Sequence, residues 1–267
     1  MGLDLNTEQE HIRTDGLEIP FFKEFYGLNV KRASEVKAAG RVLAPVYVIM
    51  ERKANSPKSD WNANYFDSGD GFAYPAKGAY EGRRFKVVLG SQELTDMKKD
   101  SDLIDKGLLI PSYEGVKGKE FAESDAILER DLKEHEVPDH QVWLELFRGN
   151  RELLGQVAQK IFKAGMDAYK HDTMMGIYLA GESAKPHVRA AIPDRLVDGS
   201  QLDGRYFLDS VYGRFVGVAP EALSAPDQLV KPYTLADLEA VDGSIRGLEG
   251  FVKTELISPI VQLRSKL

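Results

Sequence analysis

The chain has 267 residues, of which 43% are hydrophobic and 29% charged, close to the averages of globular proteins, so general disorder and fibrous repeats are excluded. It contains no cysteine, which excludes disulfides, thiolate metal sites and a thiol nucleophile. Its formal net charge of -7 gives no overall attraction to nucleic acid phosphates or to an anionic membrane, so neither is an expected partner.

The sequence predicts no membrane segment. Residues 1–10 are polar and acidic and lack the basic and then apolar run of a signal peptide. The longest apolar run, at residues 42–50, is interrupted by Pro45 and falls far short of the roughly twenty residues that a spanning helix needs. We therefore expect a protein of the cytoplasm or of an assembled particle, not one exported by a signal peptide.

The first half of the chain predicts mainly strands. After a short helix that begins at Thr7, residues 41–50 are rich in Val, Ile and Tyr and predict a buried strand, with Pro45 at an edge or bulge. Residues 84–89 predict a second strand. Between them, residues 55–82 show neither a helical nor a strand period, and this predicts a long loop insertion.

The second half predicts mainly helices. Apolar residues recur near helical spacing over residues 121–137, among acidic residues that would face solvent. The clearest helix follows Asn150, a preferred N-cap residue, and carries one apolar stripe. Two Asp-Gly turns and the aromatic residues 205–218 predict a small antiparallel β element, and a last helix begins at Thr234.

This segregation predicts an α+β fold, because strands lie mainly before residue 95 and helices mainly after it. We expect a strand-rich N-terminal part over residues 1–120 that contains the loop insertion. A mainly helical part with a small β element would follow over residues 121–267. A chain of this length could also form one compact domain.

One set of residues has the chemistry of a metal site. His140 is followed by adjacent His171 and Asp172 and then by Asp194, and this order resembles that of HD-type metal phosphohydrolases. The resemblance implies an α-helical site in which these four side chains hold Mg or Mn, which would generate hydroxide from bound water. The alternative is that His171 and Asp172 follow a helix end, where a histidine interacts favourably with the helix dipole.

A second metal hypothesis rests on the end of the predicted strand at residues 46–50. Glu51 and Lys53 follow it, and some nucleases place a metal-binding carboxylate and a lysine at such a strand end. That pattern also requires an upstream acidic residue, for which Asp15 and Glu35 are the choices. The alternative is that these charged residues simply close a strand at the surface.

The predicted loop at residues 55–82 is rich in aromatic residues. Five of them form the candidate contact surface: Trp61, Tyr65, Phe66, Phe72 and Tyr74. Exposed aromatic rings contribute strongly to protein interfaces and can also stack on bases. Since the chain is acidic overall, packing against a partner protein is favoured over base stacking, although the rings could equally belong to the core.

Two functions remain in contention. The first is a non-enzymatic assembly subunit that binds other proteins, including copies of itself, in a larger complex such as a viral particle, and needs no cofactor. The second is a divalent-metal phosphohydrolase or nuclease that uses the His and Asp residues or Glu51 and Lys53. We favour the first, because the candidate ligands lie on separate predicted elements while the aromatic loop offers one continuous segment.

Overall fold

The structure, a computed structural model, describes residues 22–56, 60–79, 83–220 and 223, and the described residues as far as Pro220 belong to one compact unit. Within these residues twelve strands form three sheets. The strands are β1(Phe22–Gly27), β2(Val42–Leu43), β3(Gly71–Tyr74), β4(Arg84–Val88), β5(Leu103–Ile104), β6(Gly107–Leu109), β7(Lys119–Ala122), β8(Ile177–Tyr178), β9(His187–Ala190), β10(Ile192–Pro193), β11(Leu202–Asp203) and β12(Gly213–Val218). The helices are α1(Asn29–Ala38), α2(Val46–Asn55), α3(Asp60–Ala63), α4(Gln92–Thr95), α5(Gln141–Leu146) and α6(Arg151–Tyr169), with 3-10 turns η1(Glu123–Asp125), η2(Glu134–Asp139) and η3(Leu196–Asp198).

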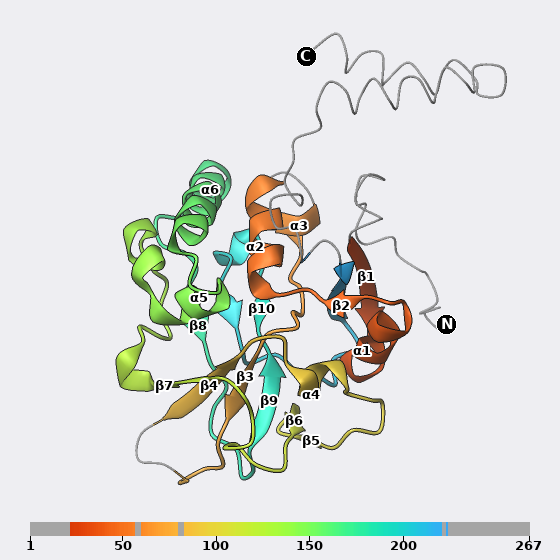
Figure 1. The fold of residues 1–267 in the computed structure, drawn as a ribbon. Coiled ribbons are helices and arrows are strands. Elements are labelled where there is room, and N and C mark those ends of the chain that lie inside the picture. Colours follow the sequence, from red (N-terminus) through yellow and green to blue (C-terminus); the bar gives the residue numbers. More distant parts are fainter. Residues whose placement is uncertain (1–21, 57–59, 80–82, 221–222, 224–267) are drawn as a thin grey trace, which may run out of the picture. The chain divides into compact units, whose positions relative to one another are not determined.

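An antiparallel sheet of six strands, in the order β5-β6-β9-β3-β4-β7, forms the centre of the unit. A second sheet has the order β1-β12-β2, and a small third one the order β10-β11-β8. The helices α2, α5 and α6 lie together above the six-stranded sheet (Figure 1). In the central sheet β9, from the second half of the chain, pairs with β3 and β6 from the first half.

Side chains alternate between the two faces of the central sheet, as strand geometry requires. Phe72 and Phe85 point to a core that also contains Trp143 and Ile161 from the helices. Residues of the opposite face, such as Val188, join a second core with α1, α4 and Phe215 of β12. The unit thus has apolar layers on both faces of one sheet.

The helix predicted after Asn150 is confirmed. The Asn150 side-chain oxygen accepts a hydrogen bond from the Leu153 amide at 3.0 Å and so caps α6. The helix ends where Lys170 adopts a left-handed conformation. The strand predicted at residues 84–89 is likewise confirmed as β4.

The expected layout of a strand-rich N-terminal part and a helical C-terminal part is wrong. Two helices, α1 and α2, lie early in the chain, while β8 to β12 all follow α6. In particular β9 pairs with both β3 and β6 in the central sheet. Antiparallel pairing joins segments that are distant in sequence, so local periodicity does not reveal which half of the chain supplies a sheet.

Residues 41–50 illustrate the same correction at the level of one element. Their Val and Ile content favours a strand, but only β2 is extended and Pro45 becomes the N-cap residue of α2. The Asp70 carboxylate accepts a hydrogen bond from the Val46 amide at 2.7 Å, so a distant residue caps this helix. Tertiary contact therefore overrides the local strand propensity.

The helix expected at residues 121–137 is also wrong. Its first residues belong to β7, which pairs with β4. Glu129 then has a positive φ of 57°, and the Glu129 and Leu132 amides donate to the Ile177 and Met174 carbonyls instead of to their own turn. The helices expected from Thr7 and Thr234 lie outside the described residues.

The predicted loop at residues 55–82 contains α3, β3 and a buried crossing point at residues 67–71. The Asp67 amide donates to the Arg214 carbonyl, and the Gly69 amide donates to the Ala44 carbonyl at 2.8 Å. The Ala191 amide donates to the Asp70 carbonyl at 2.9 Å. This short segment therefore connects β12, β2 and the chain between β9 and β10.

Glycine is required where the crossing backbones approach most closely. A Cβ atom at Gly69 would lie 2.7 Å from Leu43 Cβ and 2.8 Å from its carbonyl oxygen. A Cβ atom at Gly71 would lie 2.7 Å from the Arg189 carbonyl oxygen. No other residue fits these two positions without moving the neighbouring backbone.

Two buried carboxylates hold the crossing in place. Asp70 accepts hydrogen bonds from the Gly90 amide at 2.8 Å and from Arg148 Nη2 at 3.0 Å, in addition to the bond from Val46. Asp67 accepts from Asn29 Nδ2 at 2.9 Å and from the Arg214 amide at 2.6 Å. Burial raises the pKa of Asp67 to about 6, although these hydrogen bonds act in the opposite direction.

Lys53 is fully buried and joins three segments through its ammonium group. Its Nζ donates to the carbonyl oxygens of Trp61 and Asn64, both at 2.7 Å, and to that of Asp194 at 3.0 Å. Burial lowers the pKa of Lys53 to about 7, with Asp194 opposing that shift. The lysine therefore fixes the path of residues 61–64 against α2.

No described helix has the length and apolar content needed to cross a bilayer.

Replacing Lys53 by Met should lower the free energy of unfolding by about 3 kcal/mol or more, because three buried carbonyl oxygens would lose their donor. Urea unfolding measures the change. Lys160→Met is the matched control, since Lys160 lies on an exposed surface and its Nζ donates to the side-chain oxygen of Asn55. Equal effects of the two substitutions would contradict the assigned role of Lys53.

The raised pKa of Asp67 predicts a defined pH window. Below pH about 4 the carboxyl is protonated in both states, and as the pH rises through 6 the folded protein loses the stability gained from binding that proton. The free energy of unfolding, relative to that of Asp67→Asn, should therefore fall by about 3 kcal/mol between pH 4 and 7. A difference independent of pH, measured by urea unfolding, would show that Asp67 titrates normally.

Candidate functional site

The loop between β11 and β12 carries the largest exposed apolar side chains grouped in one described segment. Tyr206 is 36% exposed, Phe207 43%, Val211 60% and Tyr212 61%. We use the name aromatic face for these four residues and the half-buried Tyr65, which contacts the Tyr206 ring and the Tyr212 carbonyl. Scattered exposed apolar residues are common, but a group of this kind on one loop is a candidate interaction site.

Tyr65 ties the far end of the loop to the rest of the unit. Its hydroxyl donates to the Tyr212 carbonyl at 2.6 Å, and its ring stacks on that of Tyr206 with centroids 5.5 Å apart. Burial, with Asp67 next in effect, raises the pKa of Tyr65 to about 12. The phenol therefore remains a hydrogen-bond donor at every physiological pH.

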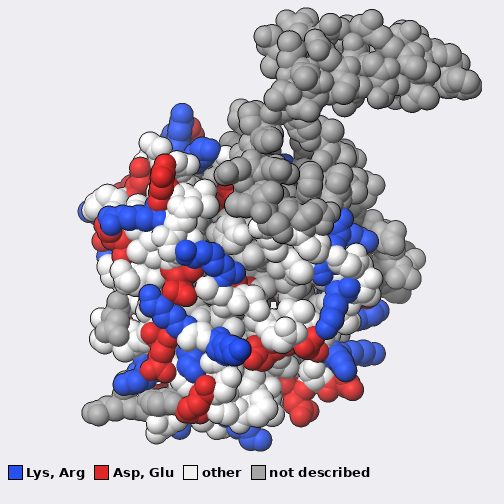
Figure 2. All heavy atoms as spheres, in the orientation of Figure 1, with Lys and Arg blue, Asp and Glu red and all other residues white. Residues whose placement is uncertain are grey.

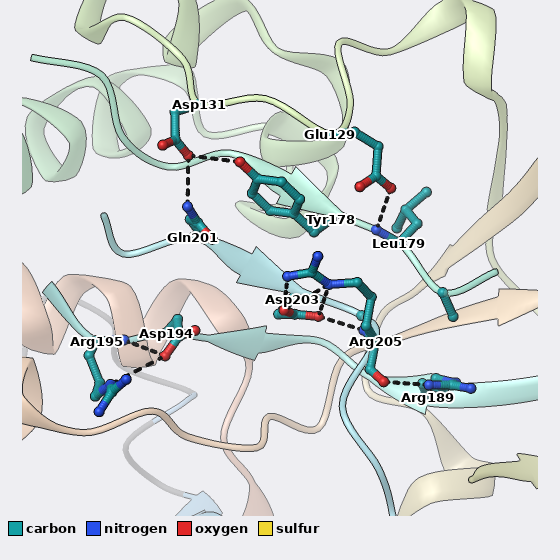
Figure 3. A network of polar contacts seen from close by, with 12 residues as sticks. Glu129, Asp131, Tyr178, Leu179, Arg189, Asp194, Arg195, Gln201, Asp203 and Arg205 are labelled. Carbon is teal, nitrogen blue, oxygen red and sulfur yellow. Dashed lines mark hydrogen bonds and ion pairs between the residues drawn. The ribbon is translucent and has the colours of Figure 1, made fainter. Parts of the chain in front are cut away.

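The near end of the loop is held by a charged pair. The Asp203 carboxylate accepts from the Arg205 amide at 2.6 Å and from Arg205 Nε and Nη2 (Figure 3). The Arg205 guanidinium lies 4.7 Å from the centre of the Tyr178 ring, whose hydroxyl donates to Asp131. Gln201 also donates to Asp131, so this end of the loop is supported by a continuous polar network (Figure 3).

Leu208 anchors the middle of the loop. It is 1% exposed and belongs to the second core, and its amide donates to the Lys106 carbonyl at 2.9 Å. Lys106 Nζ in turn lies 3.5 Å from the centre of the Phe207 ring. The backbone of the loop is thus held at both ends and in the middle, while its aromatic side chains point outward.

The arginines around the aromatic face are paired with carboxylates. Arg205 pairs with Asp203, Arg195 with Asp198, and Arg214 with Glu24. Over the side of the protein seen in Figure 2, basic and acidic side chains are interspersed without an extended region of one sign. The arrangement suits binding through apolar contact and hydrogen bonds, in which no single strong charge dominates.

No protein-family model and no curated protein matches this sequence. One solved structure resembles it, and it is described by the words "Accommodation of massive sequence variation in Nanoarchaeota by the C-type lectin fold". The two share 16% sequence identity with a TM-score of 0.53, over 74% of this chain and 97% of that one. The described unit has a C-type lectin-like fold. Within this C-type lectin-like unit the aromatic face lies on the loop that leads into β12.

The structure disperses the four side chains of the first metal hypothesis. His140 is buried as the N-cap of α5, with Nε2 2.7 Å from the Ile127 carbonyl. His171 Nε2 lies 3.0 Å from the Val197 carbonyl, and Asp172 is exposed just past the end of α6, as the helix-end interpretation expects. Asp194 accepts a hydrogen bond from the Arg195 amide. Across residues 22–56, 60–79 and 83–220 no three His, Asp or Glu side chains gather to hold a metal ion.

Glu51 and Lys53 do not form the expected pair either. They lie on helix α2 and not at a strand end, two residues apart, so their side chains leave the helix in different directions. Lys53 is buried with its Nζ donating to carbonyl oxygens, while Glu51 is half-buried. The carboxylate and ammonium that the nuclease hypothesis requires therefore face separate surroundings.

Four of the five candidate contact residues are buried, which corrects the predicted contact surface. The buried rings are those of Trp61, Phe66, Phe72 and Tyr74, each no more than 4% exposed. They fill the core because residues 60–74 form α3, the crossing and the central strand β3. Tyr65 alone of the five lies at the surface of the aromatic face.

Sequence reasoning missed Tyr206, Phe207, Val211 and Tyr212 by assigning them to a β element. A signal was present, because these residues come in adjacent pairs. Adjacent residues of a strand point to opposite faces, so two neighbouring aromatic residues fit a half-buried strand poorly. Their position after an Asp-Gly turn would have favoured a loop.

The division between anchor and exposed residues can be measured by stability. Phe207→Ser or Tyr212→Ser should change the free energy of unfolding by no more than about 1 kcal/mol, since Phe207 is 43% and Tyr212 61% exposed. Leu208→Ala should cost about 2 to 4 kcal/mol, because it empties part of the second core. Thermal and urea unfolding of the three variants measure these changes. If Phe207→Ser lowered the free energy of unfolding as much as Leu208→Ala, the assignment of Phe207 as an exposed residue and of Leu208 as an anchor would be wrong.

Proposed function

We propose that this protein is a binding or assembly subunit that contacts another protein through the aromatic face. The observation that carries the proposal is the exposure of Phe207, Val211 and Tyr212 on a backbone that is held by hydrogen bonds from Tyr65 and to Lys106. Ordering a flexible loop on binding costs free energy, and a loop already held in place avoids that cost. Exposed aromatic rings beside arginines are also the side chains that contribute most at protein interfaces.

The balanced charge of the surface supports a protein partner over a polyanion. Arg195, Arg205 and Arg214 each have a carboxylate partner, so they offer little unpaired positive charge to a phosphate backbone. Tyrosine hydroxyls and arginine groups at the rim can still form hydrogen bonds with a protein surface. A larger complex in which this chain is one subunit would place such a surface against a neighbour.

The solved structure with the same fold adds a further consideration. It is described as accommodating massive sequence variation, which concerns that protein alone. In this chain, contacts from Arg189, Leu208 and Tyr65 hold the β11–β12 loop by its backbone and by one buried side chain. The most exposed side chains, Val211 and Tyr212, could therefore vary without loss of these backbone contacts, as a contact surface that sets partner choice requires.

Photo-crosslinking tests the proposal. The full chain is made with p-benzoylphenylalanine in place of Phe207, and a matched control carries the same group in place of Tyr169, which is 47% exposed at the end of α6. Irradiation of the purified protein tests a second copy as the partner, and irradiation in extracts of the source cells tests other proteins. We expect one defined crosslinked polypeptide from position 207 and none from position 169.

The identified partner is then purified and its affinity measured. Tyr212→Ser or Tyr206→Ser should weaken binding at least tenfold, equivalent to about 1.4 kcal/mol, while Met166→Ser on α6 should leave it unchanged. If positions 207 and 169 crosslink equally, or if Tyr212→Ser binds as tightly as the unaltered chain, the aromatic face is not the binding site.

A further inference from the structure

Arg189 reaches from the central sheet to two loops that are far apart in the sequence. It lies on β9 and is 6% exposed. Its Nη1 donates to the Arg205 carbonyl at the start of the β11–β12 loop (Figure 3), and its Nη2 donates to the Asp105 carbonyl in the turn between β5 and β6. One guanidinium therefore bridges both segments through backbone oxygens.

The two bridged segments also touch each other beside the aromatic face. The Leu208 amide donates to the Lys106 carbonyl, and Lys106 Nζ lies over the Phe207 ring. Lys106 is exposed and makes no ion pair within the part of the chain that the structure describes. It thus places a positive charge, available to a partner's carboxylate, next to the exposed ring.

This junction is energetically costly. Arg189 is buried without a carboxylate ion pair in the described residues, its Nε has no hydrogen-bond partner there, and burial lowers its pKa. Burying a guanidinium in this way is unfavourable, and an apolar side chain would fill the space at lower cost. Asp105 and Lys106 have positive φ angles of 46° and 67°, as the two residues that connect the strands of a tight hairpin commonly do.

We propose that Arg189 is a positioning residue that joins the β5–β6 turn to the β11–β12 loop and makes Lys106 part of the contact surface. The partner would present an apolar side chain to Phe207 and a carboxylate to Lys106. The statement about the partner rests on the proposed function, whereas the joining of the two segments does not. Arginine suits this task because its planar fork reaches two acceptors at once.

Amide hydrogen exchange followed by NMR on the full chain tests the junction without a partner. Arg189→Met should raise the exchange rates of the hydrogen-bonded amides of the β5–β6 hairpin and of the Leu208 amide together, by at least about tenfold. Exchange in α6 and in the β1-β12-β2 sheet should stay unchanged. A general loss of stability would instead accelerate exchange in these elements as well. Arg189→Lys keeps the charge but not the fork, and should raise both rates by a smaller amount.

Lys86→Met is the matched control. Lys86 lies on β4 of the same sheet, separated from β9 by β3, and its Nζ donates to the carbonyls of Tyr113 and Val116 in another loop. The substitution Lys86→Met should accelerate amide exchange only around residues 113–116. Unchanged exchange at either joined segment in Arg189→Met, or the same pattern in Lys86→Met, would overturn the proposal. If Arg189→Met fails to fold, the exchange rates of the same two segments in Arg189→Lys test the proposal.

Binding then separates the two proposals. Lys106→Glu should weaken partner binding at least tenfold, because a carboxylate at position 106 would repel the partner's carboxylate. Lys77→Glu is the control. Lys77 follows β3 and pairs with Glu182, and its substitution should leave the affinity for the partner unchanged. A joined pair of segments without any crosslink from position 207 would remove the proposed function and leave the role of Arg189 intact. Full binding by Lys106→Glu would remove Lys106 from the contact surface.

Discussion

The fold depends on the buried crossing at residues 67–71. In this segment the Asp67 and Asp70 carboxylates accept hydrogen bonds from Asn29, Val46, Gly90, Arg148 and Arg214, and the backbone of the segment also bonds to Ala44 and Ala191. Buried carboxylates are costly unless each oxygen is satisfied, and here every bond that satisfies them also fixes a neighbouring segment. The β1-β12-β2 sheet and the six-stranded sheet are held together at this point.

Because β12 is fixed through Asp67, the loop that precedes it has a fixed end. Tyr65, two residues before the crossing, donates to the Tyr212 carbonyl, and β12 begins at the next residue. At the other end Asp203 and Arg205 belong to a polar network that reaches Asp131. The exposed aromatic residues are thus presented by the same contacts that hold the sheets together, and this explains how a long loop can carry a preformed surface.

Residues whose types indicated metal chemistry serve structural purposes in this unit. His140 caps α5, and Lys53 binds three carbonyl oxygens beside Asp194. Imidazole, carboxylate and ammonium groups satisfy buried backbone atoms as readily as they bind metals, so residue type alone does not distinguish the two uses. Spatial convergence is the deciding property, and the four proposed ligands of the first hypothesis do not converge in the described part of the chain.

The amino-acid sequence by itself determined the local features. Helix α6 follows from its N-cap Asn150 and its apolar stripe, and β4 follows from its run of β-branched and aromatic residues, because hydrogen bonds and burial within one short segment decide both. Only the tertiary structure decided that Val46 starts a helix, that Phe72 is buried and that Phe207 is exposed. Each of these depends on a partner far away in the sequence, such as the Asp70 carboxylate or the Lys106 carbonyl, and periodicity carries no information about such partners.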